Sequence, residues 1–231
     1  MAITNHMWDH TISDWSGGAF YEKQDFLHIN QIREELNRAN KSNSDIKFLF
    51  GCEAEYSFKH RRPAITPEVA EQMEIILAPN SHTHITMPRS FYKSHRKHIL
   101  YMIDAFNDIV HSDMAKYITA IPHPFIAVSC PYDNHQLLNE ITDDEFKSCF
   151  DAAAAKNIAL EINPNFLKHK TLSQMYDDPI FRMYRIGKEC GCKFTVGSDS
   201  HDSSGFDTFP LIYVMITLLD LKKNDFIDLT R

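Results

Sequence analysis

Short apolar runs suited to buried strands recur along the chain, with helix-patterned stretches between them. The runs cover residues 2–5, 46–52, 75–79, 117–122, 158–160 and 193–196. Strands that alternate with helices indicate a parallel sheet, and a closed parallel barrel gathers the C-terminal ends of its strands at one mouth. The pattern therefore predicts an α/β fold in a single domain spanning residues 1–231.

The helices are predicted from apolar residues spaced three or four positions apart. They cover residues 26–36, 95–111, 142–155, 171–190 and 209–221. The second places His98 on its polar face, the third starts with a capping box at Thr142, and Gly191 stops the fourth.

Composition limits the classes of function. A chain of 231 residues that is 43% hydrophobic can bury one sizeable core. A net charge of −7 without a long basic run argues against a nucleic-acid partner. Five cysteines without paired CxxC spacing fit reduced thiols. The apolar run 211–219 is too short for the ~20 residues of a membrane helix, and no targeting segment is apparent, so we expect a cytoplasmic protein that does not bind membranes.

Residues able to ligate a metal follow the predicted strands. They are His6, Glu53, His82, His123, Asp199 and His201. In an extended chain the side chains of Asp199 and His201 point the same way, and a carboxylate with an imidazole can bind one divalent ion or two neighbouring ones. Parallel strand ends meet at one mouth, so we expect these side chains to lie close together.

Other interpretations stay open for each residue. Asp199 and His201 suit an ordinary turn, and Glu53 could pair with a lysine or arginine. The basic cluster 59–62 suits a solvated loop better than a phosphate site. Glu161, at another strand end, could hold a histidine or a loop amide, and Arg89 is a weak candidate for binding a substrate phosphate.

Six short motifs, taken in order, resemble the PHP (polymerase and histidinol phosphatase) family. They are Asn5-His6, Gly51-Cys52-Glu53, Ser81-His82-Thr83-His84, Ile121-Pro122-His123-Pro124, Leu160-Glu161-Ile162-Asn163-Pro164 and Gly197-Ser198-Asp199-Ser200-His201. The resemblance runs from Ala2 to about Asp202. It implies a distorted (β/α)7 TIM-like barrel, with up to three metal ions at the strand C-termini and hydrolysis of phosphate esters.

One departure from the family concerns the N-terminus. The family opens with an Asp-x-His-x-His strand, and this sequence contains no counterpart before His6. The barrel is therefore expected to lack its first β/α unit. Met1 could be an internal methionine, the chain could have been cut, or the lineage could have lost the unit; we favour a missing N-terminus, because residues 1–4 read as a strand interior. Two open sheet edges would then favour partial opening or a homodimer.

The resemblance also implies roles for the predicted ligands. Glu53 would bridge ions and complete one metal site with His82 and His123, while His6 and His201 would serve a second site and Asp199 a third. Among these residues Glu53, Asp199 and His201 are the expected catalytic residues. Histidine and carboxylate ligands suit two to three Zn²⁺, Mn²⁺ or Fe²⁺ ions.

These observations predict a metal-dependent phosphatase that hydrolyses a phosphate monoester on a small metabolite through a metal-activated hydroxide. Two alternatives stay open. The chain could be a catalytically impaired metal-binding protein or an accessory module. It could also be a metal-dependent hydrolase of another bond, as amidohydrolase-like barrels are.

Overall fold

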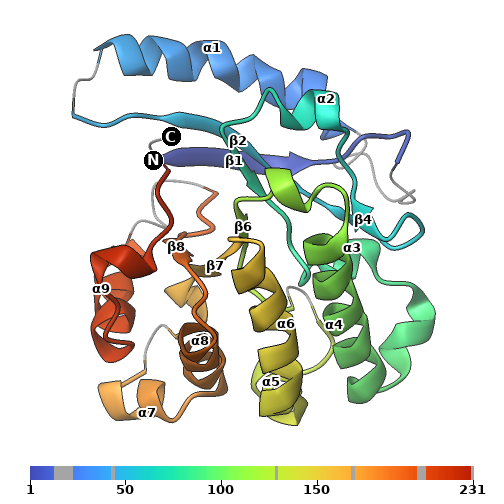
Figure 1. The fold of residues 1–231 in the computed structure, drawn as a ribbon, viewed down its shortest axis with the longest axis vertical. Helices are drawn as coiled ribbons and strands as arrows, with labels where there is room; N and C mark the ends of the chain where they lie inside the picture. The colour runs from blue at the N-terminus through green and yellow to red at the C-terminus, as the bar shows by residue number, and fades with distance from the viewer. Residues whose placement is uncertain (13–22, 43–44, 128–129, 168–169, 202–206, 230–231) are drawn as a thin grey trace.

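Six parallel strands form the central sheet of the protein, in the order β1-β2-β5-β6-β7-β8 (Figure 1). The strands are β1 (Ala2–Met7), β2 (Leu49–Ala54), β5 (Ile75–Leu77), β6 (Ala120–Ile121), β7 (Ala159–Ile162) and β8 (Phe194–Val196). The computed structural model describes residues 1–12, 23–42, 45–127, 130–167, 170–201 and 207–229. Each strand falls within or beside a predicted apolar run, which confirms the parallel α/β fold.

Helices connect successive strands and cover the sheet. They are α1 (Phe26–Ser42), α2 (Pro67–Ala70), α3 (Thr83–Thr86), α4 (His95–His111), α5 (Asn134–Glu140), α6 (Asp143–Ala155), α7 (Leu172–Tyr176), α8 (Pro179–Glu189) and α9 (Phe209–Leu218). Single 3-10 turns are η2 (Arg89–Lys93), η3 (Ala115–Tyr117), η4 (Pro164–Leu167) and η6 (Lys223–Asp225), and β3 (Tyr56–Ser57) pairs with β4 (Arg62–Pro63). Helix α6 packs between α4 and α8, whereas α1 lies along β1 and β2 (Figure 1). No described helix has both the length and the apolar composition to cross a membrane.

Two sequence predictions about helices were wrong. The helix predicted over 171–190 is divided into α7 and α8, because Asp178 caps α8 by accepting the Ile180 N–H and Pro179 occupies its first turn. His98 does not lie on a polar face but is fully buried in α4, where its ring meets Tyr92 and Tyr132 edge-on. Burial lowers the pKa of His98 to about 4.

The apolar core lies on both faces of the sheet, as the period of two along a strand requires. Phe50, Ile76, Ile121 and Leu160 face the helices, where the main cluster includes the stacked rings of Phe106 and Phe125, 5.3 Å apart. Their strand neighbours form a smaller cluster on the other face, made by Leu49, Ile75, Leu77, Ala120 and Ala159. All five cysteines carry free thiols, as predicted.

The C-terminal segment lies against the outer strand β8, which the sequence did not predict. Phe226 forms a parallel bridge with Phe194 of β8, and the Ile227 N–H donates to the Phe194 carbonyl at 3.0 Å. Ile227, Leu229 and Ala2 of β1 each pack against the smaller apolar cluster. The segment therefore covers the N-terminal end of β8, away from the strand ends that carry the predicted ligands. Whether the sheet belongs to a barrel of seven units stays a prediction.

Candidate metal centre

Four predicted ligands meet at the C-terminal ends of neighbouring strands. His6 lies near the end of β1, Glu53 near the end of β2, and His82 and His123 follow β5 and β6. The register pairs His6 with Glu53 directly across β1 and β2, so their side chains share one face of the sheet. The parallel sheet thus brings together residues that are up to 117 positions apart (123 − 6).

The carboxylate of Glu53 is the centre of this cluster. Its Oε1 lies 3.6 Å from Nε2 of His82 and 3.4 Å from Nε2 of His123, and its Oε2 lies 3.5 Å from Nδ1 of His6. One ligand atom from each of His6, Glu53 and His82 falls within 4.8 Å of the others. Ligands about 2.0–2.2 Å from a tetrahedral zinc ion lie roughly 3.3–3.6 Å from one another. The contacts of Glu53 therefore match the spacing of ligands around a shared ion.

Neighbouring side chains hold Nδ1 of each imidazole; in His82 and His123 this is the nitrogen away from Glu53, whereas in His6 the same Nδ1 also faces Glu53. Nδ1 of His6 donates to Glu55 Oε1 at 2.7 Å, and Nδ1 of His82 donates to the same oxygen at 2.9 Å. Nδ1 of His123 lies 2.7 Å from Oγ of Ser81. Such contacts fix the ring orientation of a metal-binding histidine.

His123 has a buried nitrogen that the described protein atoms leave unsatisfied. Only 1% of this residue is exposed, and its Nε2 has no hydrogen-bond partner within the part of the chain that the structure describes. Glu53 Oε1 lies 3.4 Å from it, an ion-pair distance rather than a well-formed hydrogen bond. His123 also has a φ of 29°, a conformation that non-glycine residues adopt at an energetic cost. A metal ion on Nε2 would satisfy this atom, so the cluster fits a divalent ion.

Opposite charges in the cluster shift its pKa values. Burial lowers the pKa of His6, but the hydrogen bond and charge of Glu55 and the charges of Glu53 and Asp199 outweigh this and raise the pKa to about 9. Burial also lowers the pKa of His123, and the carboxylates around it raise it to about 9. Burial raises the pKa of Glu53, but the three surrounding imidazoles lower it to about 2. Glu53 therefore stays ionised at neutral pH, as a metal ligand must.

Glu161 adds a further carboxylate from the end of β7. It is 6% exposed and accepts the His123 backbone N–H; burial, opposed by the charge of His123, raises its pKa to about 8. Gly197 leaves room for it, because a Cβ at that position would lie 2.3 Å from the Glu161 carboxyl carbon. From the sequence, Glu161 was expected to hold a histidine or a loop amide, and its hydrogen bond from the His123 backbone N–H agrees with that interpretation.

Asp199 and His201 follow β8 and are both exposed. The charge of Asp199 contributes to the raised pKa values of His6 and His123. An extended chain was the basis for expecting the side chains of Asp199 and His201 to point the same way. The φ of Asp199 is 48°, so the chain is not extended there. His201 Nδ1 instead lies 3.2 Å from the Asp199 carbonyl. Their metal-binding and catalytic roles stay predictions.

The predicted phosphate contacts lie outside the cluster. Arg89 is exposed at the start of η2, and within the described residues no ion pair involves it. Arg61 pairs with Asp108 at 2.8 Å and Arg62 with Asp113 at 3.0 Å, which supports the surface-loop interpretation of the basic segment. A role for Arg89 in substrate binding therefore stays a prediction.

The sequence interpretation assigned no role to Glu55 and Ser81. Each lies next to a predicted ligand in sequence, Glu55 two residues after Glu53 and Ser81 one residue before His82. The alternation of β2, which places Glu55 on the same side as Glu53, was the signal that could have identified the second carboxylate.

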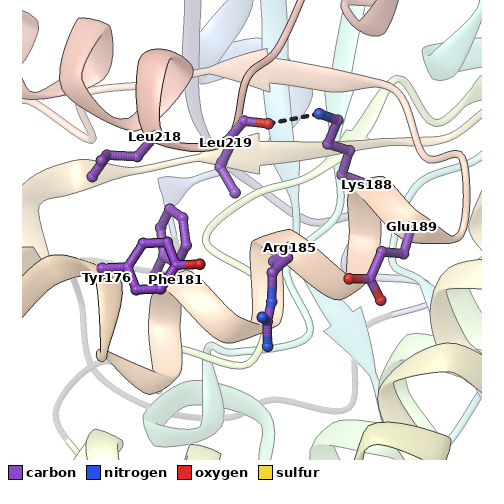
Figure 2. A pocket seen from close by; sticks show the side chains of 7 residues that line it. All are labelled: Tyr176, Phe181, Arg185, Lys188, Glu189, Leu218 and Leu219. Atoms are coloured by element: carbon purple, nitrogen blue, oxygen red, sulfur yellow. Dashed lines mark hydrogen bonds between the residues drawn. The ribbon is translucent and has the colours of Figure 1, made fainter.

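Two pockets lie away from the cluster. One, of 310 Å³, is lined by Tyr176, Phe181, Arg185, Lys188, Glu189, Leu218 and Leu219, from α7, α8 and the end of α9, and Figure 2 shows Lys188 Nζ donating to the Leu219 carbonyl. The other, of 430 Å³, contains the ion pair of Lys170 and Asp178. Neither contains a predicted ligand.

No model of a known protein family matches the sequence, and no curated protein matches it. Among solved structures, the chain is similar to a histidinol phosphate phosphatase from Lactococcus lactis subsp. lactis, solved with zinc, L-histidinol and phosphate. The two are 15% identical, with a TM-score of 0.49 over 94% of this chain and 92% of that one. At this level of similarity the match assigns no role to any residue of this chain.

Proposed function

We propose that this protein is a metal-dependent phosphomonoesterase that acts on a small phosphorylated metabolite. The observation that supports it most is the position of Glu53, whose Oε1 faces His82 and His123 while its Oε2 faces His6. A carboxylate with different histidines at its two oxygens is suited to bridge two ions.

The proposed ligands are His6, Glu53, His82 and His123, with Asp199 and His201 as further ligands from the loop after β8. Mixed imidazole and carboxylate donors suit Zn²⁺, Mn²⁺ or Fe²⁺. When bound, such ions neutralise phosphate oxygens, lower the pKa of water and stabilise the charge on the leaving oxygen. Glu53, Asp199 and His201 are the proposed catalytic residues.

The charges of the protein explain why a phosphate substrate would need ions here. Four carboxylates, Glu53, Glu55, Glu161 and Asp199, lie at or near the cluster, as their effects on the pKa values of its histidines show. They would repel a phosphate group in a chain whose net charge is already −7. Divalent cations reverse this local charge, so metal binding and phosphate binding are expected to depend on each other.

A metal-binding protein without turnover is the second candidate, and the loop after β8 favours it. Asp199 and His201 are exposed, and the described contact of the His201 ring is with the carbonyl of its own loop. If these residues do not close on bound ions, the remaining four ligands could hold metal without completing a catalytic site.

Hydrolysis of p-nitrophenyl phosphate by the metal-stripped chain, titrated with Mn²⁺ or Zn²⁺, tests the proposal. We expect activity that requires metal and disappears in His123→Ala. His111→Ala is the matched control, because His111 is exposed at the end of α4 and its ring hydrogen-bonds to the Asn107 carbonyl of its own helix. Metal binding without hydrolysis would favour the second candidate. Turnover of a p-nitroanilide amide but not of the phosphate would favour a hydrolase of another bond.

A further inference from the structure

Glu55 lies directly behind two of the proposed ligands. It follows β2, is 2% exposed, and its Oε1 accepts hydrogen bonds from Nδ1 of His6 at 2.7 Å and from Nδ1 of His82 at 2.9 Å. Its Oε2 lies 3.0 Å from the same nitrogen of His82. One buried carboxylate therefore contacts two imidazoles that come from strands on either side of β2.

The backbone of Glu55 is held as firmly as its side chain. Its N–H donates to the Met7 carbonyl at 3.0 Å, at the end of β1, and its own carbonyl accepts the Ala64 N–H at 2.7 Å. These backbone hydrogen bonds hold the Glu55 Cα in place, so the position of the carboxylate orients the two rings. An acceptor on Nδ1 selects the tautomer with hydrogen on that nitrogen, which leaves Nε2 with a lone pair.

We propose that Glu55 is a positioning residue that holds both His6 and His82 as Nδ1–H tautomers, so that each binds metal through Nε2. The inference rests on the proposed function only in assuming that the cluster binds a divalent ion. The orientation of His82 supports it, because its Nδ1 contacts Glu55 while its Nε2 faces Glu53 Oε1 at 3.6 Å. In His6 the Nδ1 held by Glu55 at 2.7 Å is also the nitrogen 3.5 Å from Glu53 Oε2, so the choice of Nε2 as the metal-binding atom of His6 rests on the shorter contact with Glu55. His123 has the Ser81 hydroxyl on Nδ1, which can accept that hydrogen but can also donate its own, so it does not fix the tautomer as a carboxylate does.

A direct role for Glu55 as a metal ligand is the competing explanation. Both of its oxygens already lie 2.7–3.0 Å from imidazole nitrogens, which is hydrogen-bond distance to Nδ1–H groups. Those protons would have to leave before either oxygen could reach an ion. Glu53, which has no contact with the histidines shorter than 3.4 Å among the described pairs, has room for one.

The test is long-range ¹H–¹⁵N NMR of the histidine rings in the zinc-loaded chain, assigned with His6→Gln and His82→Gln. We expect both rings to carry hydrogen on Nδ1 and zinc on Nε2, with slow exchange of the Nδ1 protons. Glu55→Ala should lose this protection and weaken zinc binding about 10–100-fold without changing the number of ions bound. Glu55→Gln, which keeps an acceptor oxygen and the size of the side chain, should lose less proton protection and less zinc affinity. It also serves as the second variant if Glu55→Ala does not fold. Glu68→Gln, at an exposed position of α2, is the matched control.

Two results would overturn the inference. One is a wild-type spectrum with zinc on Nδ1 of either ring. The other is the loss of one bound ion in both Glu55 variants, which would make Glu55 a ligand. Fixed Nδ1–H tautomers in a protein that does not hydrolyse phosphate esters would contradict only the proposed function, whereas a chain that binds no zinc would contradict both.

Discussion

Metal binding to this cluster should release protons. Without metal, the pKa values of His6 and His123 are about 9, so both rings are imidazolium at neutral pH. A metal ion replaces a ring proton, because only a deprotonated nitrogen can coordinate it. Each ring would keep the proton on Nδ1, next to Glu55 or Ser81, and would lose the proton on Nε2.

The size of the effect follows from these pKa values. At pH 7 each ring lies about two pH units below its pKa, so its deprotonation costs about 2.7 kcal/mol, at 1.36 kcal/mol per unit. Two rings give about two protons released per filled cluster and an affinity that rises about 100-fold per pH unit near pH 7. Glu161, with a pKa of about 8, adds at most one further proton. Since the rings lose their protons near pH 9, the dependence should flatten there.

Isothermal titration calorimetry measures the number directly. Mn²⁺ is titrated into the metal-stripped chain at pH 7 in buffers with different enthalpies of ionisation, and the slope of observed enthalpy against buffer enthalpy gives the protons released. His123→Ala should release about one proton fewer. His95→Ala should change nothing, because His95 contacts Glu140 on the surface. Release of less than one proton by the wild type, or an affinity independent of pH between 6.5 and 8.5, would show that the two rings are not protonated imidazoliums before the metal binds.

Three further predictions concern stability and the support of the ligands. Metal-free protein should be most stable between about pH 4.5 and 6.5. The raised pKa values of His6 and His123 stabilise the fold fully below pH 6.5, and this stabilisation is lost as the pH rises towards 9. The lowered pKa of Glu53 stabilises the fold fully above pH 4.5, and this stabilisation is lost as the pH falls towards 2. Thermal unfolding in chelator at pH 6 and pH 9 checks this, and equal midpoints would contradict it. Gly51→Ala should lower the free energy of unfolding by about 1–3 kcal/mol, because the new Cβ would lie 2.4 Å from the Ile75 carbonyl oxygen and push β2 away from β5. Gly187→Ala, in helix α8, should cost less, because its new Cβ meets chiefly the flexible tip of the Leu160 side chain of β7. Denaturant unfolding of both variants decides between them, and an equal loss of stability would contradict this prediction. Ser81→Ala should weaken Mn²⁺ binding about 10–100-fold, because the His123 ring loses the hydrogen bond that orients it. Ser112→Ala is the control and should leave the affinity unchanged, because the Ser112 hydroxyl bonds only to the Ile109 carbonyl among the described hydrogen bonds. Equal affinities of the two variants by calorimetry would show that Ser81 does not support the site.

The pattern of apolar positions was enough to predict the strands and the place where the ligands meet. Each strand lies within or beside an apolar run, and parallel pairing brings their C-terminal ends together, so His6, Glu53, His82 and His123 could be grouped without a structure. Their order along the sheet follows the order of the strands in the sequence, which makes this kind of site unusually readable from the chain.

Features that depend on contacts between distant residues could not be predicted in the same way. The hydrogen bonds of Glu55 join it to histidines 49 and 27 positions away, and no local pattern specifies them. The same holds for Phe226 beside β8. His98 was misjudged because α4 is covered by neighbours on more than one side, which an amphipathic pattern does not reveal.

Two other errors had local causes that the periodicity concealed. Asp178-Pro179 is a helix start inside an otherwise helical pattern, and it divides α7 from α8. Asp199 takes a positive φ, so the alternation expected between Asp199 and His201 does not apply. Turn chemistry therefore decides the geometry of the last pair of predicted ligands, and the period of a strand does not.

If Glu53 is the shared carboxylate of a divalent metal site, crystals of the chain grown with Mn²⁺ should show the ion there by anomalous diffraction. We expect an anomalous peak within coordination distance of the Glu53 carboxylate, with His82 and His123 among the ligands, and loss of that peak in Glu53→Gln. A manganese-saturated crystal in which Glu53 contacts only the imidazoles, with every peak elsewhere, would contradict it.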